Sequence, residues 1–399
     1  MPINIISLIM LAVPPAITSE LSWTSPDIRI TTEWSLNVLD LIDPAYTHIG
    51  TVYASESEEG FEWHTVLVDK EYVLLLEGDT VVDRIPYSGD IWRMTFSPDC
   101  RYLLGYCYND GKFLLFDLAE STVKTIPLFS DGMELHGNPL IRVTNHGTVL
   151  VKHSTYLRMY DSDFSCILSR DNFSWGQAFI GLSNAGDRFY TTTHDSLRAY
   201  DMQGNLLWNR ELHENADEFY ISRDGTFLIA FNSHIIQLIN SAECNQIARI
   251  EFEERISNPV FSESESLIAV GYWTHPQITP LRPINSFGAR KVSLRNGSFE
   301  LYSHFQAANS LSEPGMPHSL RCHSISDSGY LLGMLSYDRP EIFACLVLLS
   351  SDMQIIWLSN NISQGSLRFI GTYGEFRSDG SAFWYFDGES IHSCLIEGV

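Results

Sequence analysis

Histidines recur at nearly equal intervals through the middle of the chain. His153, His194, His234 and His275 are separated by 41, 40 and 41 residues, which places them at equivalent points of successive repeats. Imidazole binds metals and transfers protons, but either role needs two or three groups within a few ångströms. Equivalent loops of neighbouring repeats diverge, so we expect no metal site. We interpret these residues as one loop face that contacts a partner, or else as ordinary polar loop histidines.

A second chemical feature is a cluster of cations in a chain that contains only five lysines. Residues 273–297 include Arg282, Arg290 and Lys291, with Pro, Gly and polar residues between them. A long stretch of this composition is usually functional or disordered, so we predict an insertion outside the repeats. A guanidinium near Trp273 could anchor an acidic or glycan partner. The alternative is a tether without a ligand.

The loops that join successive repeats are expected on the same face as the histidines. The complete set of candidate partner-binding residues is Trp273, His275, Arg282, Arg290, Lys291, Trp175, His153, His194 and His234. Known catalytic spacings are missing from the sequence, including the G-x-S-x-G elbow, the H-E-x-x-H pair and the Gly-rich phosphate loop. We therefore favour a non-catalytic protein without a cofactor, although single residues on separate loops can still assemble a catalytic site.

Seven cysteines are scattered through the sequence without a C-x-x-C pair or a zinc-type spacing. An odd number leaves at least one thiol unpaired in a monomer, which is the state we expect. We predict that most of these cysteines are small buried hydrophobic residues on strands rather than members of a disulfide framework.

The composition and the charge limit the class of protein. With 44% hydrophobic and 19% charged residues, the chain has ample material for a buried core and is globular. Its 49 acidic and 25 basic residues give a net charge of −24, which disfavours phosphate backbones and anionic lipid. Nucleic acid is therefore not expected as a partner.

The N-terminus carries a short apolar run, residues 5–13, followed by Pro14, Pro15 and Ala16. This length fits a signal-peptide core and is too short to span a bilayer. We predict a signal peptide in residues 1–20 and an extracytoplasmic protein, periplasmic or secreted, with no membrane span. The alternative is that the run is a strand of the fold itself, because no basic residue precedes it.

A turn signal recurs seven times along the chain. In each copy an apolar residue is followed by Ser, Thr or Arg, two further residues and usually Gly, and three of the six intervals are 39 or 40 residues. The copies are Phe96–Cys100, Val143–Gly147, Leu182–Gly186, Ile221–Gly225, Phe261–Glu265, Ile325–Gly329 and Phe376–Gly380. Each predicts a hairpin, and a period near 40 with four strand-sized runs is typical of a β-propeller blade.

A second landmark keeps the same period. An apolar or aromatic residue followed by Asp or Asn recurs at Asp117, Asp161, Asp201 and Asn240. Such a side chain can accept hydrogen bonds from turn amides, so we predict that it closes the turn between the third and outermost strands.

The segment Leu197–Trp208 (LRAYDMQGNLLW) resembles the repeat of quinoprotein-type (PQQ-like) propellers, in which Ala-x-Asp, a Gly turn and a Trp recur. Leu346–Trp357 is a weaker echo without the Gly and the aligned Asp. The Ser-x-Asp-Gly turns resemble those of WD40-like and TolB-like propellers, although the Gly-His and Trp-Asp signature of WD40 repeats is missing. The resemblance implies the propeller fold only, because such propellers include dehydrogenases, assembly factors and scaffolds.

The last repeat has only two strands after Gly380, so its outermost strand must come from elsewhere. We predict that an N-terminal strand completes it, which removes an exposed sheet edge. Residues 21–399 are then a single all-β propeller domain with eight four-stranded blades, or seven if the first hairpins only cap the ring. We expect this propeller to bind a protein or carbohydrate partner through its loop-rich face. The alternative is a quinoprotein-like enzyme with a small molecule at the ring axis.

Overall fold

A computed structural model describes residues 28–397 except for 38–40, 42–47, 50–63, 69–70, 98, 100, 128–138, 154–155, 171–179, 184–185, 193–195, 212–217, 223–224, 258, 263, 274–283, 296–297, 311–316, 340–341, 360–367, 370–373, 378–379 and 388–389. The regular structure of these residues consists of β-strands alone, as predicted. The predicted signal peptide, residues 1–20, lies outside them. The chain divides into two compact units, which are described in turn.

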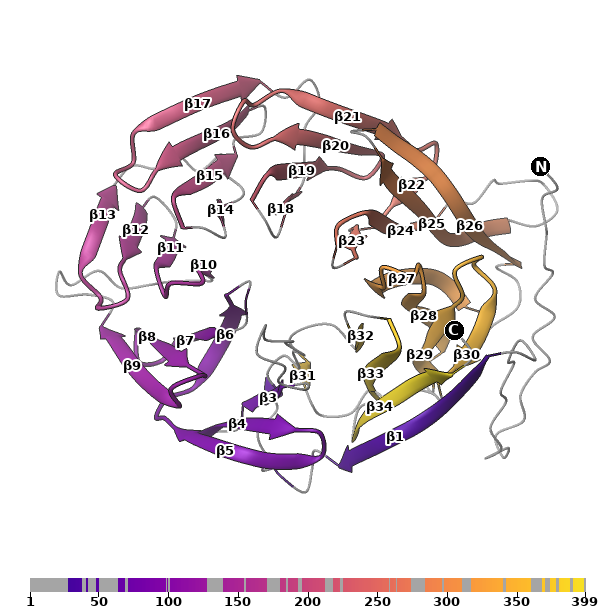
Figure 1. Cartoon of the computed structure of the whole chain (residues 1–399), viewed down its shortest axis with the longest axis horizontal. Helices are drawn as coiled ribbons and strands as arrows, with labels where there is room; N and C mark the ends of the chain where they lie inside the picture. Colours follow the sequence, from indigo (N-terminus) through magenta and orange to yellow (C-terminus); the bar gives the residue numbers. More distant parts are fainter. Residues whose placement is uncertain are drawn as a thin grey trace. The chain divides into compact units, whose positions relative to one another are not determined.

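One unit comprises residues 42–249 and 368–371. Its sheets are antiparallel, and neighbouring strands in each sheet follow one another in the sequence (Figure 1). The strands are β3 (His64–Val68), β4 (Tyr72–Glu77) and β5 (Thr80–Pro86); β6 (Ile91–Phe96), β7 (Tyr102–Cys107), β8 (Lys112–Asp117) and β9 (Thr122–Pro127); β10 (Leu140–Val143), β11 (Val149–His153), β12 (Tyr156–Tyr160) and β13 (Cys166–Arg170); β14 (Ile180–Leu182), β15 (Arg188–Thr192), β16 (Ser196–Asp201) and β17 (Leu206–Glu211); and β18 (Glu218–Ile221), β19 (Phe227–Phe231), β20 (Ile235–Asn240) and β21 (Gln246–Glu251). A short parallel pair joins β2 (His48–Ile49) to β31 (Arg368–Phe369).

The other unit comprises residues 1–41, 250–367 and 372–399. Its first sheet has an interrupted inner strand, because β22 and β23 both pair with β24. Its strands are β22 (Arg255–Ile256), β23 (Val260–Phe261), β24 (Leu267–Trp273), β25 (Ile284–Arg295) and β26 (Ser298–Ser310); β27 (Pro317–Ile325), β28 (Leu331–Arg339), β29 (Ile342–Leu349) and β30 (Ile355–Leu358); and β32 (Gly374–Phe376), β33 (Ala382–Phe386) and β34 (Ser390–Glu397), which β1 (Arg29–Asn37) joins. With the β2–β31 pair set aside, the described strands form eight sheets. The number of blades stays a prediction.

The last sheet confirms the predicted closure by an N-terminal strand. Its strand order is β1-β34-β33-β32, so β1 supplies the outermost strand (Figure 1). The antiparallel register runs from Arg29 opposite Glu397 to Asn37 opposite Ser390. The strand that the last repeat lacks in sequence is thus taken from the other end of the chain, and β34 has a partner on both sides.

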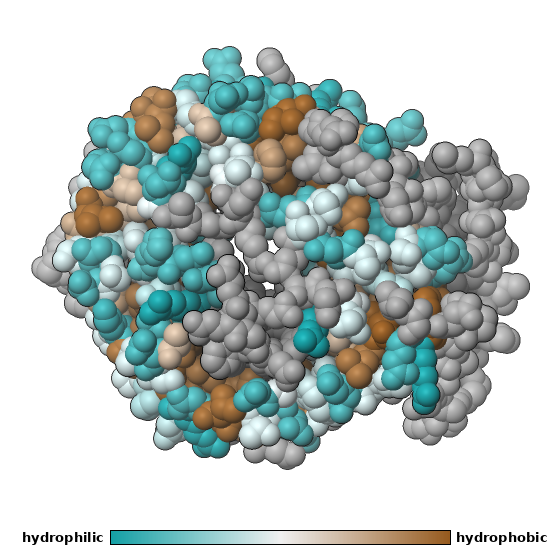
Figure 2. Space-filling view, viewed as in Figure 1, coloured by the Kyte–Doolittle hydropathy of each residue, from teal (hydrophilic) through white to brown (hydrophobic). Residues whose placement is uncertain are grey.

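Apolar layers fill the space between neighbouring sheets within each unit. The central strands β11 and β12 are buried along their whole length, whereas the outermost strand β17 alternates between exposed and half-buried residues. The layer between the β6–β9 and β10–β13 sheets includes Leu104, Phe113 and Val151. Each fully buried side chain of this size contributes about 1.5–3 kcal/mol to folding. On the outside, Figure 2 shows a mainly hydrophilic or neutral surface over the described residues in that view.

The recurring Ser or Thr is the structural centre of the first hairpin turn in six of the seven copies. The Ser222 hydroxyl accepts a hydrogen bond from the Phe227 amide at 2.8 Å, and the Ser262 and Ser326 hydroxyls are placed in the same way. All three serines are at most 2% exposed. The turn needs a left-handed residue, which is Gly at φ 74° for Gly225 but Glu265 at φ 57° in the next repeat. The hairpin prediction is therefore confirmed at these turns.

The recurring Asp or Asn closes the turn before the outermost strand, as predicted. Asp201 Oδ1 accepts hydrogen bonds from the amides of Gln203 and Asn205 at 3.0 and 2.7 Å. Asp161 and Asn240 accept bonds from turn amides in the same manner. Hydrogen bonds from Asn205 lower the pKa of Asp201, because they stabilise the carboxylate.

Cations on outermost strands connect neighbouring sheets, a feature that the sequence pattern does not reveal. Lys124 on β9 donates to the carbonyl oxygen of Ser162 at 3.0 Å, in a turn of the next sheet. Arg170 on β13 donates to Gly204 O. Arg210 on β17 donates to the carbonyl oxygen of the corresponding turn in the β18–β21 sheet. Each contact satisfies a turn carbonyl with a charged donor.

The prediction of an insertion at residues 273–297 was wrong. β24 extends to Trp273, and residues 284–295 form the strand β25, which pairs with β24 from Phe287 to Ser293. From Phe287 to Ser293 every residue is buried except Arg290, which is half-buried, so this part of β25 lies inside the sheet with both sides covered. The basic residues of this stretch are therefore part of the sheet, and the connection between β24 and β25 spans residues 274–283.

Candidate functional site

Several predicted partner-binding residues lie outside the described part of the chain. These are His194, Trp175, His275 and Arg282. Trp273 is the last residue of β24, and its backbone alone is described. Four candidates can be placed with their side chains, namely Arg290, Lys291, His153 and His234. Arg290 and Lys291 are neighbours on β25, whereas His153 and His234 belong to two other sheets.

Lys291 is buried in the core and is not an exposed anchor, so its predicted place in an insertion outside the repeats was wrong. Its side chain is 0% exposed, and Nζ donates to Gly329 O at 2.8 Å and to Ser351 O. Burial lowers the pKa of Lys291 to about 8, because the ammonium loses its hydration, while the charge of Asp352 acts in the opposite direction. This lysine joins the β22–β26 sheet to turns of the β27–β30 sheet.

Arg290, the neighbour of Lys291, points to the opposite side of β25. Its guanidinium forms an ion pair with Glu254 and lies 5.2 Å from the ring centre of Tyr272. The Tyr272 hydroxyl donates to the carbonyl oxygen of Phe305 at 3.3 Å. An arginine held by an acid and a ring within its own sheet has a structural role here, and its role in binding stays a prediction.

His153 and His234 both lie where the second strand of a sheet turns into the third, as the spacing predicts. His234 follows β19 and is half-buried, with its amide bonded to Asn232 Oδ1 at 2.8 Å. His153 is the last residue of β11, is only 9% exposed and has its ring centre 5.3 Å from that of Tyr156. His153 therefore belongs to a polar cluster that the sequence alone does not identify.

This cluster occupies one edge of the layer between the β6–β9 and β10–β13 sheets. Tyr106 on β7 and Tyr156 on β12 are both in the apolar core of that layer, at 1% and 7% exposure. Arg158 pairs with Val151, another residue of this core, and its guanidinium lies 5.3 Å from the Tyr156 ring centre. We call Tyr106, His153, Tyr156 and Arg158 the tyrosine cluster.

The two tyrosine hydroxyls of the cluster are not satisfied within the described chain. Neither the Tyr106 nor the Tyr156 hydroxyl oxygen has a hydrogen-bond partner among the residues that the structure describes, although both atoms are buried. Burial raises the pKa of Tyr106 and raises that of Tyr156 to about 12, so both phenols are neutral donors at physiological pH. A buried polar group without a partner costs about 1–3 kcal/mol, so such groups call for an explanation.

Sequence reasoning misses Tyr106 and Tyr156 because each lies in an apolar run that reads as an ordinary strand. The cluster depends on strand register and on contact between two sheets, which the sequence pattern does not reveal. Its one recognisable signal is the histidine spacing that places His153 at a turn between the second and third strands.

The two tryptophans of the quinoprotein-like segments have structural roles in the described chain. Trp208 Nε1 donates to the carbonyl oxygen of Ser241 at 3.1 Å, and its ring packs against Tyr190. The ring centre of Trp357 lies 5.3 Å from that of Phe383 on the next sheet. Both rings join an outermost strand to the following sheet, so they contribute to the packing of the repeats.

Cysteines and metal-ligand residues give no further site. Of the six cysteines that the structure describes, four are buried, which confirms the predicted packing role for most of them. Within the described ranges, no three His, Cys, Asp or Glu side chains are grouped so that they could hold a metal ion. The same part of the chain contains no helix with the length and hydrophobicity needed to cross a bilayer.

Comparison with known proteins identifies the fold. No protein family and no curated protein matches the sequence. BamB from Moraxella catarrhalis is similar in structure, with 10% sequence identity, a TM-score of 0.52 and coverage of 92% of this chain and 100% of that one. The fold is a β-propeller. The repeated turn pattern predicts this fold, and the four-stranded sheets are its blades.

Two further solved structures are similar at a lower level. The C-terminal WD40 domain of Sif2 has 9% identity and a TM-score of 0.48, with coverage of 87% of this chain and 81% of that one. Hydrazine synthase from Kuenenia stuttgartiensis has 14% identity and a TM-score of 0.47, with coverage of 75% and 94%. The fold assignment rests on BamB together with the sheets described above.

Proposed function

We propose that this β-propeller is a non-catalytic, extracytoplasmic binding protein that contacts a protein partner at the face where the second and third strands of its blades turn. The observation that carries the proposal is the tyrosine cluster, which places two buried donors without a described partner at this edge of two neighbouring blades. Exposed Tyr108 belongs to the β7–β8 turn, and its ring centre lies 6.4 Å from that of Tyr106. Aromatic residues beside buried polar groups are typical of binding hot spots.

Site-specific cross-linking tests which face binds. A photo-reactive amino acid replaces Tyr108, and in a matched variant it replaces Glu120, which is exposed at the opposite edge of the same blade in the β8–β9 turn. We expect the partner from the native source to be cross-linked by the first variant and not by the second. Cross-linking from Glu120 alone, or equally from both, would contradict the proposed face. A glycan-modified product at position 108 would instead favour a carbohydrate partner.

The proposed location is tested separately. Fractionation of the native source and mass spectrometry of the first peptide should find the mature protein outside the cytoplasm, with an N-terminus between residues 16 and 20. An intact Met1 on a cytoplasmic protein would contradict export while leaving the binding proposal standing.

A further inference from the structure

The tyrosine cluster offers hydrogen-bond donors and lacks acceptors for them within the described chain. A neutral phenol can donate one hydrogen bond, and neither the Tyr106 nor the Tyr156 hydroxyl has a partner there. Buried donors of this kind call for an acceptor, which water or a ligand can supply. A ligand suited to both tyrosines, which belong to one core layer, would present two acceptor atoms.

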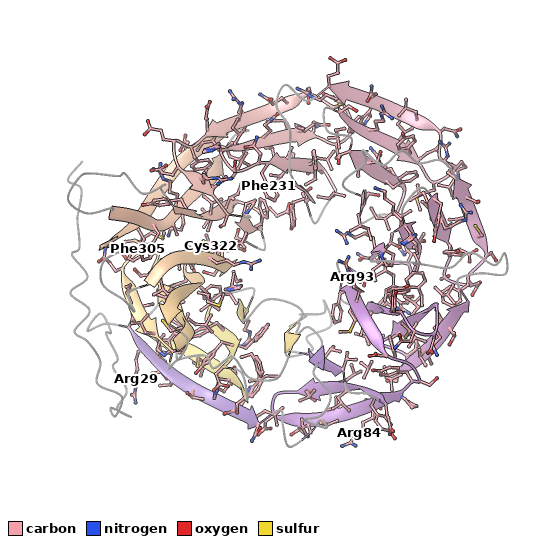
Figure 3. The ribbon with its side chains drawn as sticks, turned by 180° about the vertical axis from the view of Figure 1, so that it is seen from behind. Arg29, Arg84, Arg93, Phe231, Phe305 and Cys322 are labelled. Atoms are coloured by element: carbon pink, nitrogen blue, oxygen red, sulfur yellow. The ribbon has the colours of Figure 1, made fainter. Side chains whose placement is uncertain are left out.

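Positive charge faces the same layer. Arg158 donates to the carbonyl oxygen of Leu157 at 3.3 Å and holds its guanidinium beside Tyr156. Arg93 on β6 pairs with Tyr106, so strand register puts both side chains on one side of the β6–β9 sheet. Its Nη1 donates to Pro139 O at 3.2 Å, next to β10 of the facing sheet, and Figure 3 labels this arginine. Two guanidinium groups near two phenols favour an anionic acceptor.

The cluster lies near solvent on one side. Tyr156 is the first residue of β12 and His153 the last of β11, so both are at the end of their strands. Tyr106 is one residue from the end of β7, and Tyr108 beyond it is 40% exposed. Both hydroxyl oxygens are shielded from solvent, so a group from a partner reaches them from the turn side only when a side chain such as Tyr108, which lies beside Tyr106, moves aside.

We infer that the tyrosine cluster binds the carboxylate of an Asp or Glu side chain that the protein partner presents. This inference rests on the proposed function and specifies its chemistry. The Tyr106 and Tyr156 hydroxyls donate to the carboxylate, and Arg158 provides the compensating charge. Exposed Tyr108 contacts the residues on either side of the acidic one. An amide side chain of the same size has one acceptor instead of two and no charge, so it binds less well.

Short peptides test the inference without the natural partner. Acetyl-Gly-Glu-Gly-amide and acetyl-Gly-Gln-Gly-amide are titrated into the full chain with ¹³C-labelled tyrosine rings, and ring signals are followed by NMR. We expect the Glu peptide to shift the Tyr106 and Tyr156 signals and the Gln peptide to bind at least tenfold more weakly. The signals are assigned from the Tyr106→Phe and Tyr156→Phe variants.

Variants separate recognition from folding. Each Tyr→Phe substitution should weaken binding of the Glu peptide about tenfold, because a hydrogen bond to a charged acceptor is lost. Tyr102→Phe, at the other end of β7, should not change it. Arg158→Gln should remove the preference for Glu over Gln, with its melting temperature measured to confirm that it folds. Equal binding of both peptides, or shifts that survive both Tyr→Phe substitutions, would overturn the carboxylate assignment.

The peptide titration and the cross-linking experiment test two separate claims, so either claim can be contradicted without the other. If the Glu peptide binds but the photo-reactive residue at position 108 cross-links no partner, the carboxylate site is supported and the protein-binding function is contradicted. If a partner is cross-linked at position 108 but the peptide shifts no tyrosine signal, the function stands and the hydroxyls are satisfied by ordered water, which overturns the inference.

Discussion

The Nζ atom of Lys291 lies 2.8 Å from the carbonyl oxygen of Gly329, so a buried ammonium on one blade holds a hairpin turn of the next. The pKa of Lys291 is lowered to about 8 by its burial, whereas an unfolded lysine titrates near 10.5. Between these values the unfolded state binds more protons than the folded state. The free energy of unfolding therefore gains a contribution from Lys291 that rises with pH over this window.

Lys291→Met should remove this pH dependence. We expect the difference in unfolding free energy between the parent and the variant to shift in favour of the parent as the pH rises from 8 to 10.5. Urea denaturation of both proteins at several pH values measures this difference. Subtracting one unfolding free energy from the other cancels the contribution of the titrating groups that both proteins contain. Parallel pH profiles would show that Lys291 titrates normally.

Tyr106→Phe and Tyr156→Phe should stabilise the protein when no ligand is present. Each substitution removes a buried hydroxyl without a described partner and keeps the ring, so we expect a gain of about 1 kcal/mol in unfolding free energy. Tyr102→Phe is the control on the same strand and should give no such gain. A loss of stability in the two cluster variants would mean that their hydroxyls are already bonded within the folded chain.

Deletion of residues 28–37 should leave β34 without its outer neighbour. An unpaired edge recruits other strands, so we expect aggregation and a lower melting temperature. Light scattering and thermal unfolding follow the two effects, and a synthetic peptide of residues 27–38 added in trans should reduce both. A truncated protein that stays monomeric and melts at the parent temperature would contradict the closing role of β1.

Arg170→Gln should weaken the contact between the β10–β13 and β14–β17 blades. The substitution removes the charged donor to Gly204 O and the cation beside the Tyr200 ring, which together are worth about 1 kcal/mol or more. Arg198→Gln carries the same charge change, but Arg198 bonds to Asn209 within its own sheet. Chemical denaturation should show a larger loss of unfolding free energy for Arg170→Gln than for Arg198→Gln. Equal losses in the two variants would mean that the change in net charge causes the effect.

Much of the fold can be predicted from the sequence, because its turns use the same local hydrogen bonds in successive repeats. Ser222 and Asp201 bond to amides within five residues of themselves, so the spacing of such residues alone predicts two hairpins in each of the four repeats that carry both landmarks. The missing outer strand of the last repeat predicted closure by β1 for a similar reason, since a blade with an open edge is incomplete. These features depend on short-range contacts or on simple strand counts.

The strand β25 was missed because its buried side lacks the usual apolar pattern. Between Phe287 and Ser293, the buried positions include Ala289 and Lys291. Gly288 reads as a loop residue, yet a Cβ there would collide with the backbone of Phe305 on β26. The burial of Lys291 is explained by its hydrogen bond to Gly329 O, which lies 38 residues further along the chain. Contacts of this range are set by the tertiary structure.

The candidate site was predicted least well, for the same reason. His153 is selected by its spacing and lies beside Tyr156, but Tyr106 belongs to a different blade and joins Tyr156 through the packing of two sheets. Lys291 was selected for its charge and is buried. Charge and periodicity locate turns and faces, whereas a site between blades depends on strand register.

The pairing of β1 with β34 also orders the events of folding. Thr31 and Glu397 share a hydrogen bond across a sequence separation of 366 residues, so their blade has the longest-range contact among those described here. Closing so long a loop carries a large entropic cost unless the intervening blades are already compact. During synthesis β1 is made before all the other described strands and β34 after them, so the pair cannot form until the strands between them have been made. The blade that contains β1 and β34 can therefore be completed only after the other described blades have been synthesised.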